Sequence, residues 1–350
     1  MRVSNILEFA PIMDNPPEHG VLEEFRLEFQ ECWQKLPHKA FFLLLLAAWL
    51  GLFQFLGNPT LGYIKSASLM RWMLDTYSPT GQYLSGDEAH AVLMPFVVLA
   101  LFWWKRKELM AVRIKLWSPA LLLIIFALFL HLAAFSVQQP KFSVIAMFVG
   151  IYGLMGLAWG PHWLKASFFP FFLLGFCMPL GDQAQIITTP LRLLVARIVA
   201  AIAHLGVAPD LVREGTQLVG GGGTFNYDVA PACSGIRSLI SLLAFASVLG
   251  FVSFRTGWKR LVMIASAFPL AVISNVIRIS FTVAVAEILG QKAGSMVEQN
   301  FGFVTFALAI GLVLLLGHWL RENKNDRAIE NKGSVPAAGA SGGILKAESP

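Results

Sequence analysis

Long apolar runs separated by short polar segments dominate the pattern of this chain. A helix that crosses a membrane needs about 20 predominantly apolar residues. By this criterion about eight segments are candidate spans, near residues 41–57, 91–104, 118–135, 143–160, 166–180, 234–254, 260–282 and 301–319. The pattern predicts an all-α protein, a multi-spanning transmembrane helical bundle.

The composition fits this class. Of 350 residues, 56% are hydrophobic and only 14% are charged, whereas a soluble domain carries about 25% charged residues. The net charge is +6, but the basic residues collect between the apolar runs, so they indicate topology rather than nucleic-acid binding. With the basic segments 105–107, 255–260 and 321–327 in the cytoplasm, both termini lie inside. We expect a multi-pass protein of the cell (inner) membrane.

The two ends of the chain differ from its apolar middle. Residues 1–39 are predicted to be a cytoplasmic amphipathic segment, residues 40–320 the transmembrane domain, and residues 321–350 a disordered cytoplasmic tail. No small-residue cleavage site follows the first apolar run, so we expect no removable signal peptide. In the N-terminal segment, the residues that recur at helical spacing, typical of a helix on the membrane surface, are Leu22, Phe25, Phe29, Cys32, Trp33 and Leu36.

One helical segment is too polar for a span. It starts at Thr189 and Pro190, runs to His204, and carries Arg192 and Arg197. Each arginine at mid-bilayer costs roughly 2.5 to 3.5 kcal/mol, and a crossing here inverts every later span against the basic-residue rule. We therefore predict a helix along the outer interface.

Two polar stretches are predicted to lie outside. Residues 58–90 form an outer loop, whose Trp72, Tyr77 and Tyr83 suit an interfacial aromatic belt. The glycines at 220–223 predict a flexible turn before a short extended piece at 225–229. They lack the strand-to-helix context and Lys-Ser or Lys-Thr pair of a phosphate loop.

The first candidate for chemistry is Cys233, which opens the sixth predicted span at its outer end. The helix dipole and free N–H groups at a helix N-terminus stabilise a thiolate, and Arg237, one turn later, adds a cation. In contrast, Cys32 and Cys177 are read as small apolar filler.

A second candidate lies in the seventh predicted span. Arg278 follows Arg260 by 18 residues, a rise of roughly 27 Å that returns the helix to the outer face. Asn275 lies three residues before Arg278, on the same side. An arginine inside a membrane indicates a functional site, with a snorkelling or structural role as the alternative.

These residues predict acyl-transfer chemistry. A thiolate at Cys233 attacks a peptide carbonyl, and Arg278, with the N–H groups near Ser234 and Gly235, stabilises the oxyanion. A third residue has to move protons, and His204, at the end of the interfacial helix, is the only outer histidine expected near the site. No spacing typical of metal ligands occurs, so neither a metal nor a cofactor is predicted.

The motifs that carry this site resemble a known family. They are the run Pro-Ala-Cys-Ser-Gly-Ile-Arg at 231–237, the Asn-x-x-Arg formed by Asn275 and Arg278, and Gly302 with Phe306 at the start of the last span. With them, the chain resembles the exosortase/archaeosortase family of membrane cysteine transpeptidases. The resemblance extends over residues 40–320, with the sharp motifs in the last third.

The resemblance implies a substrate and roles for residues. The substrates are the C-terminal tails of secreted, membrane-tethered proteins, which carry a Pro-Glu-Pro type motif, an apolar helix and a basic end. They are cut on the outer face and passed to an unidentified surface acceptor. Cys233 is then the nucleophile and Arg278 the second member of a triad. The usual third member is a histidine just before the glycine of the last span, and here Glu298 or Asn300 is expected instead, with His204 as the alternative base.

Two other functions stay open at this point. A transporter or polysaccharide-export component would bind an anionic substrate through Arg278 and Arg237. A non-catalytic assembly partner would keep the scaffold without turnover, and the missing histidine favours that hypothesis. Besides the substrate tails, the expected partner is the lipid bilayer, with no nucleic acid.

Overall fold

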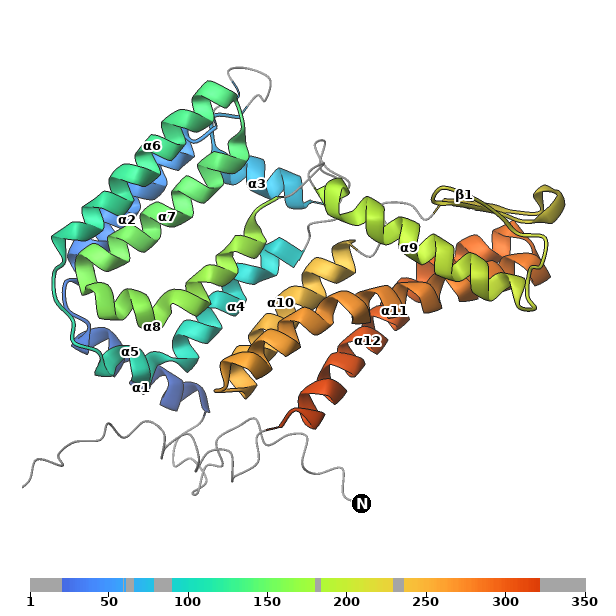
Figure 1. Cartoon of the computed structure of the whole chain (residues 1–350). Helices are drawn as coiled ribbons and strands as arrows, with labels where there is room; N and C mark the ends of the chain where they lie inside the picture. Colours follow the sequence, from blue (N-terminus) through green and yellow to red (C-terminus); the bar gives the residue numbers. More distant parts are fainter. Residues whose placement is uncertain are drawn as a thin grey trace, which may run out of the picture. The chain divides into compact units, whose positions relative to one another are not determined.

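The computed structural model of the chain describes residues 21–58, 60, 66–78, 90–179, 184–228 and 236–321. Helices account for almost all of the secondary structure in these ranges, and three short strands form one small sheet (Figure 1). Backbone contacts divide the chain into two compact units, Met1–Gly181 and Asp182–Pro350. The predicted all-α membrane class is confirmed.

Among the described residues, five helices are long and apolar enough to cross a membrane, and all coincide with predicted spans. They are Lys39–Leu56, Ser118–Val137, Pro140–Trp159, Gly257–Leu289 and Asn300–Trp319. Two shorter apolar helices, His90–Trp104 and Leu239–Ser253, match the second and sixth predicted spans.

The predicted span at 166–180 is wrong as a single helix. Its helix, α8, begins earlier, at Pro161, directly after Gly160 with a φ of 93°. It ends at Phe172, where the chain tightens into the 3-10 turn Leu173–Cys177. Hydropathy joined the two pieces because both are apolar, although Pro179 disfavours a helical residue just before it.

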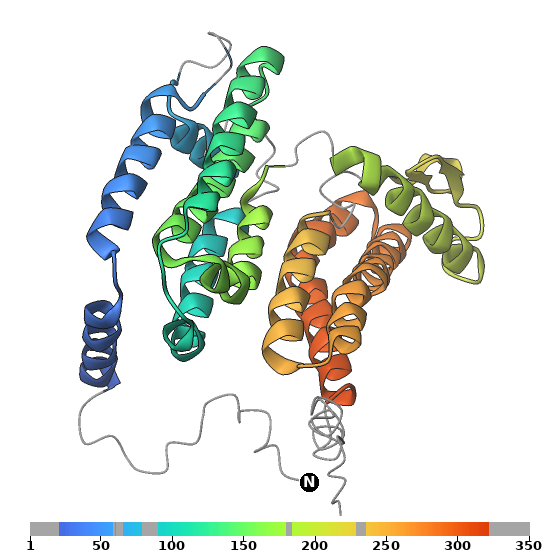
Figure 2. The same ribbon diagram turned by 60° about the vertical axis from the view of Figure 1, so that its left-hand side comes forward.

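The first unit is built around one buried helix, α7. In the most apolar stretch of α7, 61% of the residues are buried, whereas this share is 33% or less in the other candidate spans. It lies side by side with α6 in both views (Figures 1 and 2). The described elements of this unit are α1 (Val21–Lys35), α2 (Lys39–Leu56), α3 (Leu69–Tyr77), α4 (His90–Trp104), α5 (Arg106–Ala111), η2 (Ser118–Ala120), α6 (Leu121–Val137), α7 (Pro140–Trp159), α8 (Pro161–Phe172) and η3 (Leu173–Cys177).

Small residues on α7 allow its neighbours to approach closely. At Gly150 the Trp49 ring of α2 fills the place of a side chain, because an added Cβ would lie 1.9 Å from the ring. The Trp49 indole also donates a hydrogen bond to the Met147 carbonyl at 3.0 Å. Glycines at such contacts are typical of membrane helix pairs, where packing rather than hydrophobic transfer holds the helices together.

This contact gives a stability prediction. We expect Gly150→Ala to lower the free energy of unfolding by about 1 to 3 kcal/mol, because the new methyl group has to displace the Trp49 ring. Gly51→Ala on α2 is the matched control, since nothing lies within 4 Å of its added Cβ. It should be neutral or slightly stabilising. Thermal melting in detergent measures both, and equal melting temperatures would contradict the assigned contact.

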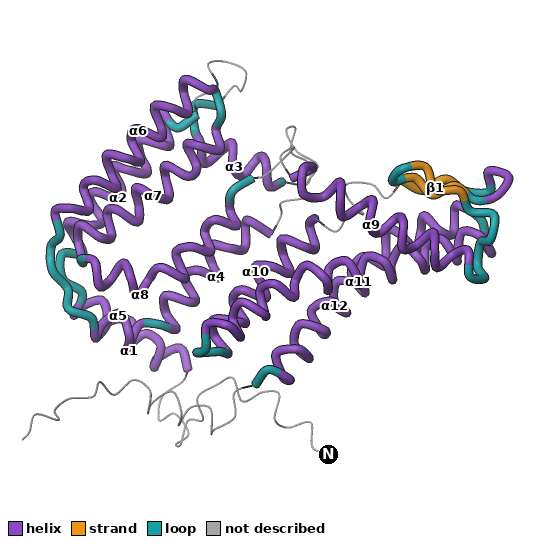
Figure 3. The backbone as a smooth tube through the Cα atoms, in the orientation of Figure 1, coloured by secondary structure: helices purple, strands orange, loops and turns teal. Residues whose placement is uncertain are grey.

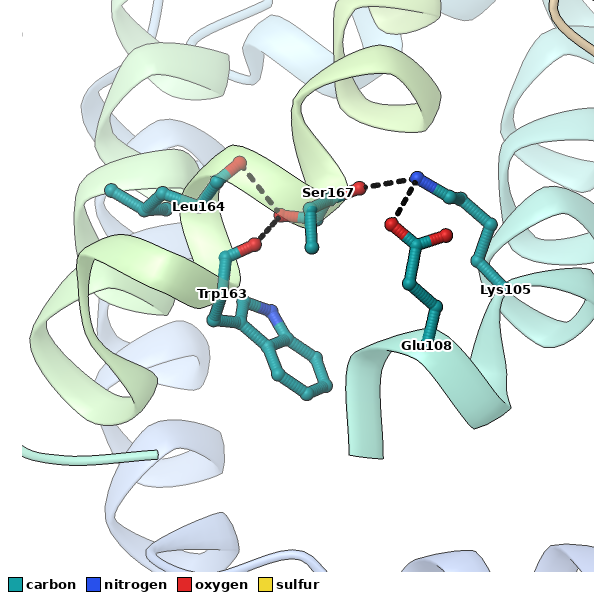
Figure 4. Close-up of polar contacts among 6 residues, drawn as sticks. Lys105, Glu108, Trp163, Leu164 and Ser167 are labelled. Atoms are coloured by element: carbon teal, nitrogen blue, oxygen red, sulfur yellow. Dashed lines mark hydrogen bonds and ion pairs between the residues drawn. The ribbon is translucent and has the colours of Figure 1, made fainter. Parts of the chain in front are cut away.

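Basic residues gather at one end of the first unit. Lys105 Nζ donates a hydrogen bond to the Ala166 carbonyl at 2.7 Å and pairs with Glu108 at 3.1 Å (Figure 4). On α8, the Ser167 hydroxyl donates back to the Trp163 carbonyl at 2.8 Å. The corner between α4 and α5 is thereby joined to α8.

The same end carries two more basic positions. The Lys115 amide donates to the Trp159 carbonyl at 3.3 Å, and the Trp159 indole donates to the Pro37 carbonyl at 3.0 Å. Pro37 lies two residues before Lys39. Loops that are distant in sequence are therefore joined at this end of the first unit, close to several basic residues.

The predicted amphipathic N-terminal helix is confirmed as α1. Phe25 packs on the Trp103 ring with centroids 4.7 Å apart, and Arg106 lies over the same ring and pairs with Glu28 at 2.5 Å. Other apolar residues of α1 stay exposed, Leu22 at 85%. Contact of this exposed surface with lipid stays a prediction.

The predicted aromatic belt is wrong for two of its three residues. Trp72 and Tyr77 on α3 are buried, at 6% and 4% exposure, and the Tyr77 hydroxyl donates a hydrogen bond to the Cys177 carbonyl. Tyr83 lies outside the described residues. A hydropathy pattern cannot distinguish an aromatic ring that faces headgroups from one that packs inside the protein.

The second unit combines a helical bundle with a small cap. In it, α10, α11 and α12 run side by side (Figure 2), and short connections join them (Figure 3). Its described elements are α9 (Ala184–His204), β1 (Val212–Glu214), β2 (Gln217–Val219), η5 (Gly221–Gly223), β3 (Asn226–Asp228), α10 (Ile236–Ser253), α11 (Gly257–Leu289) and α12 (Gln291–Trp319).

Helix α11 is longer than its predicted span. Its 33 residues cover about 50 Å, against about 30 Å for the hydrocarbon core. A turn at Gly290, with a φ of 85°, joins it to α12. The tip of this hairpin therefore extends beyond a membrane-spanning length. It stays helical there because the cap packs on it, through Ile279, Val283 and Ala286.

The cap consists of α9 and an antiparallel sheet of order β1-β2-β3. The predicted start of α9 at Thr189 is wrong, because the helix begins at Ala184 and contains Pro190. Its predicted place at the outer interface is not tested. The predicted extended piece is confirmed as β3, and Val229 lies outside the described residues. The glycine run forms the expected turn, with a positive φ at Gly222 and Gly223.

Candidate active site

Arg278 lies on α11 beside Gly302 of α12. A Cβ added to Gly302 would stand 3.5 Å from Arg278 Nη1, an ordinary van der Waals distance. Arg278 Nε and Nη2 are buried and have no hydrogen-bond partner in the described part of the chain. A guanidinium whose buried nitrogens lack partners favours an oxygen ligand, because every one of its polar atoms is a donor.

Asn275 lines a small cavity one turn before Arg278. Its side chain is 6% exposed, and its Nδ2 has no hydrogen-bond partner. The cavity lies between α9, α10 and α11, has a volume of about 10 Å³, and is lined by Asn275 and the apolar residues Leu191, Val195, Leu239, Phe268, Ala271 and Val272. A buried water needs two or more polar partners, which these walls do not supply.

The same cavity fixes the depth at which α10 begins. Leu239 of α10 shares it with Asn275 of α11, and α10 starts at Ile236, three residues before Leu239. The first turn of α10 is therefore level with the Asn275 and Arg278 part of α11.

Two contacts fix how α12 is aligned along α11. The Ser274 hydroxyl donates to the Thr305 carbonyl at 2.6 Å, and the Phe281 and Phe301 rings stack with centroids 4.7 Å apart. Glu298 precedes Gly302 by four residues, so it lies one turn further toward the hairpin tip on the same face.

Unsatisfied polar atoms concentrate on this part of α11. Within the described residues, five such buried atoms lie between positions 275 and 282: Asn275 Nδ2, Arg278 Nε and Nη2, Ser280 Oγ and Thr282 Oγ1. Buried polar groups are normally paired, and orphaned donors beside a cation can stabilise an oxyanion. This arrangement is chemically suited to hold a developing negative charge.

Comparison with known proteins identifies the family. The sequence profile described as transmembrane exosortase matches residues 82–315, about two thirds of the chain. The chain belongs to the transmembrane exosortase family. Membership supports a membrane transpeptidase-type role. No curated protein and no solved structure matches the chain.

The family profile covers most of the second unit of this exosortase but only part of the first unit. It takes in all of α9 to α11 and most of α12, and it begins at residue 82, after the end of α3. The described elements α1, α2 and α3 therefore precede the matched region. The site described above lies entirely within it.

Several predicted site residues of the exosortase lie outside the described residues. These are Cys233, Ser234 and Gly235, between β3 and α10. Arg237 belongs to the first turn of α10, but its side chain is not described. The structure thus brings together Asn275, Arg278 and the Glu298 face of α12, and the position of the nucleophile stays a prediction.

The remaining candidates are exposed and interact within their own segments. Asn300 is exposed and donates a hydrogen bond to the Met296 carbonyl of its own helix at 2.8 Å. His204 is exposed at the end of α9, and its Nδ1 lies 2.8 Å from the Pro209 carbonyl oxygen. In the described ranges, no group of three or more His, Cys, Asp or Glu residues could hold a metal ion.

The cap is tied to the hairpin just before the predicted nucleophile. The Tyr227 hydroxyl of β3 donates to the Gln291 carbonyl at 2.7 Å. Gly294 makes this approach possible, since an added Cβ would lie 2.4 Å from that hydroxyl. Sequence reasoning missed this anchor, and it also missed Thr282, whose only signal was its helical spacing from Asn275 and Arg278.

Proposed function

We propose that this exosortase is a cysteine transpeptidase that cleaves C-terminal sorting signals of exported proteins and passes the shortened proteins to a surface acceptor. The observation that carries the proposal is the half-buried Arg278 side chain, whose buried Nε and Nη2 are unpartnered in the described part of the chain and which is level with the start of α10. It provides a cation and donors at the depth where the helix after Cys233 begins. The substrate signal is of the Pro-Glu-Pro type, followed by an apolar helix and a basic end.

Chain length supports the pairing of Cys233 with Arg278. Cys233 precedes Ile236, the first residue of α10, by three residues. Three residues span at most about 11 Å, so the nucleophile cannot lie far from the depth of Arg278. At a helix start, the free N–H groups that follow also favour the thiolate.

The proposed reaction has two steps. The Cys233 sulfur bonds to the scissile carbonyl carbon, whose oxygen becomes an oxyanion beside Arg278. The C–N bond then breaks, the leaving amine takes a proton, and a thioester remains. In the second step the acceptor, water or an amine, attacks the thioester, forms the new acid or amide, and releases the thiol.

Glu298 is the best-supported candidate for the group that moves protons. It lies on the Gly302 face of α12, and a carboxylate can accept and return a proton, whereas an amide such as Asn300 can only orient a partner. Asn300 also bonds to its own helix. His204 interacts with its own loop and is the weaker alternative.

This assignment gives a prediction for a pair of variants. We expect Glu298→Gln to slow tail cleavage about 100-fold, the usual lower range for loss of a general base. Asn300→Ala should cleave at the wild-type rate, because its side chain faces outward. Single-turnover cleavage of a tail peptide in proteoliposomes measures both. A normal rate for Glu298→Gln, or a larger loss for Asn300→Ala, contradicts the assignment.

The proposed topology follows the charges. Basic segments at 105–107, 255–260 and 321–327 are assigned to the cytoplasm, with both termini. Arg278 follows Arg260 by about 27 Å along α11, so the active site belongs to the outer face of the inner membrane. The sorting signal fits this orientation, since its basic end stays inside while the bond to be cut lies outside.

Mass spectrometry of a co-expressed exported protein tests the function. The tail carries the motif, the apolar helix and the basic end, and the matched control tail lacks only the motif. We expect loss of the tail mass, with or without an added acceptor mass, for the first protein alone. An uncut tail together with flux of a labelled anion in proteoliposomes would instead support a transporter that binds anions through Arg278. An uncut tail without flux would favour a non-catalytic assembly partner.

A further inference from the structure

Thr282 on α11 carries a buried hydroxyl that makes no hydrogen bond. Its side chain is 1% exposed, and Oγ1 has no partner in the described part of the chain. Buried threonines in helices commonly bond the carbonyl four residues earlier. Thr76 does so with Trp72 at 2.8 Å, and Thr305 does so with Phe301 at 3.1 Å. The hydroxyl of Thr282 therefore differs from these two, because it does not bond the carbonyl four residues earlier on its own helix.

A buried hydroxyl without a hydrogen-bond partner destabilises the protein when no ligand is bound. A buried polar group without a partner loses its hydration and gains nothing in return. In native structures such a group often marks a site whose partner is absent. Thr282 lies one turn from Arg278, whose buried Nε and Nη2 also have no partner in the described part of the chain.

Asn275, Arg278 and Thr282 form a stripe along one face of α11. Their spacings of three and four residues place them one above another. The seven residues from Asn275 to Thr282 rise about 10 Å, the length of about three residues of extended peptide. Each of the three side chains offers at least one unpartnered polar atom that can donate.

The neighbours of the stripe are mostly apolar. Ile279 and Val283 pack into the core shared with α9, and Ser274 contacts α12. At its lower end, Asn275 meets the apolar wall formed by Leu239 and others. The stripe is therefore a narrow line of donors between apolar walls.

This geometry selects one kind of ligand. A phosphate or a free carboxylate needs donors that converge on one point, whereas these donors are spread along a line and only Arg278 is charged. A neutral chain with acceptors at intervals fits better, and the carbonyl oxygens of an extended peptide supply such acceptors.

We infer that Asn275, Arg278 and Thr282 bind the backbone carbonyl oxygens of the substrate in extended conformation, and that Thr282 is a substrate-binding residue. The inference rests on the proposed function and adds to it the conformation of the bound tail. The residues around the scissile bond leave the helical state before cleavage, because a helix would keep those carbonyls bonded within itself.

Equilibrium binding tests the inference without turnover. A fluorescent tail peptide is titrated onto the full chain with Cys233→Ala in nanodiscs, alone and combined with Thr282→Val, Thr282→Ser or Thr76→Val. Thr282→Val should weaken binding about three- to tenfold, the worth of one neutral hydrogen bond. Thr282→Ser should restore most of the affinity. Thr76→Val is the matched control, since it removes a buried hydroxyl that already has a partner, and it should bind as its parent does.

Thermal melting without peptide gives the second readout. Because Thr282→Val removes an unsatisfied hydroxyl, the unliganded protein should melt at the same or a higher temperature, while Thr76→Val should melt at the same or a lower one. Unchanged affinity in Thr282→Val, or weaker binding together with a lower melting temperature, overturns the inference. If one of these two results is found while the wild-type protein still cuts the tail, the inference about Thr282 fails and the proposed function stands. If the wild-type protein neither binds nor cuts the tail, the proposed function itself fails.

Discussion

Cys233→Ala is expected to abolish tail cleavage, with a loss of at least about 1,000-fold, because the reaction then has no nucleophile to form the thioester. The variant should accumulate in the membrane as the wild type does, since the change removes only one sulfur atom from the side chain. Gel mobility and intact mass of a co-expressed exported protein measure the effect.

The thiols elsewhere in the chain provide the control for this experiment. Cys32 on α1 is half-buried and belongs to the amphipathic N-terminal segment, so Cys32→Ala should cleave normally. Capture of the shortened protein as a hydroxylamine-sensitive adduct on the wild type, and its loss in Cys233→Ala, would support the thioester directly. Cleavage at the normal rate by Cys233→Ala would exclude the proposed mechanism.

Arg278→Lys is expected to reduce cleavage about 100- to 1,000-fold, the cost of losing an oxyanion donor. Lysine keeps the charge but replaces the planar fork with a compact ammonium, which cannot offer the Nε and Nη2 donors in the same directions. The guanidinium fits the space beside Gly302, where an added Cβ would lie 3.5 Å from Nη1. The larger loss should appear in the rate of the chemical step, because the oxyanion exists only during the reaction, with a smaller loss of tail affinity from the substrate carbonyl that Arg278 is inferred to bind.

Arg197→Lys is the matched control for Arg278→Lys. Arg197 lies on α9 in the same unit and is exposed, so exchange of its head group should leave cleavage unchanged. Single-turnover rates and tail affinities of both variants are compared at equal protein levels. A purely structural role for Arg278 would lower the melting temperature of Arg278→Lys in proportion to its activity, and that result would remove Arg278 from the mechanism.

Five helices show how far hydropathy alone reaches. The spans at 41–57, 118–135, 143–160, 260–282 and 301–319 were predicted from apolar length, and each coincides with a helix able to cross a membrane. Apolar length is enough to predict these helices because lipid cannot form hydrogen bonds with backbone N–H and C=O groups. A long apolar segment in a membrane therefore has to be helical. The same argument failed at 166–180, where prolines and a 3-10 turn interrupt an equally apolar segment.

The aromatic residues and the cap show what the hydropathy pattern cannot predict. Trp72 and Tyr77 are buried on α3, although their spacing equally fits a headgroup belt. The strands β1 and β2 were not predicted, because three-residue strands are too short to show a period of two. Their existence depends on the surface that α9 and the α11 hairpin offer.

Local composition and helical spacing were enough to identify the membrane class, the family, and the placement of Asn275 and Arg278 on one face of one helix. The same spacing puts Glu298 on the Gly302 face of α12. The packing had to be known to place Gly302 beside the guanidinium, to find Asn300 exposed, and to find the Thr282 hydroxyl without a partner in the described part of the chain. Register between helices depends on side-chain volumes across the interface, such as the Ser274 to Thr305 contact, and these pairings join residues far apart in the chain.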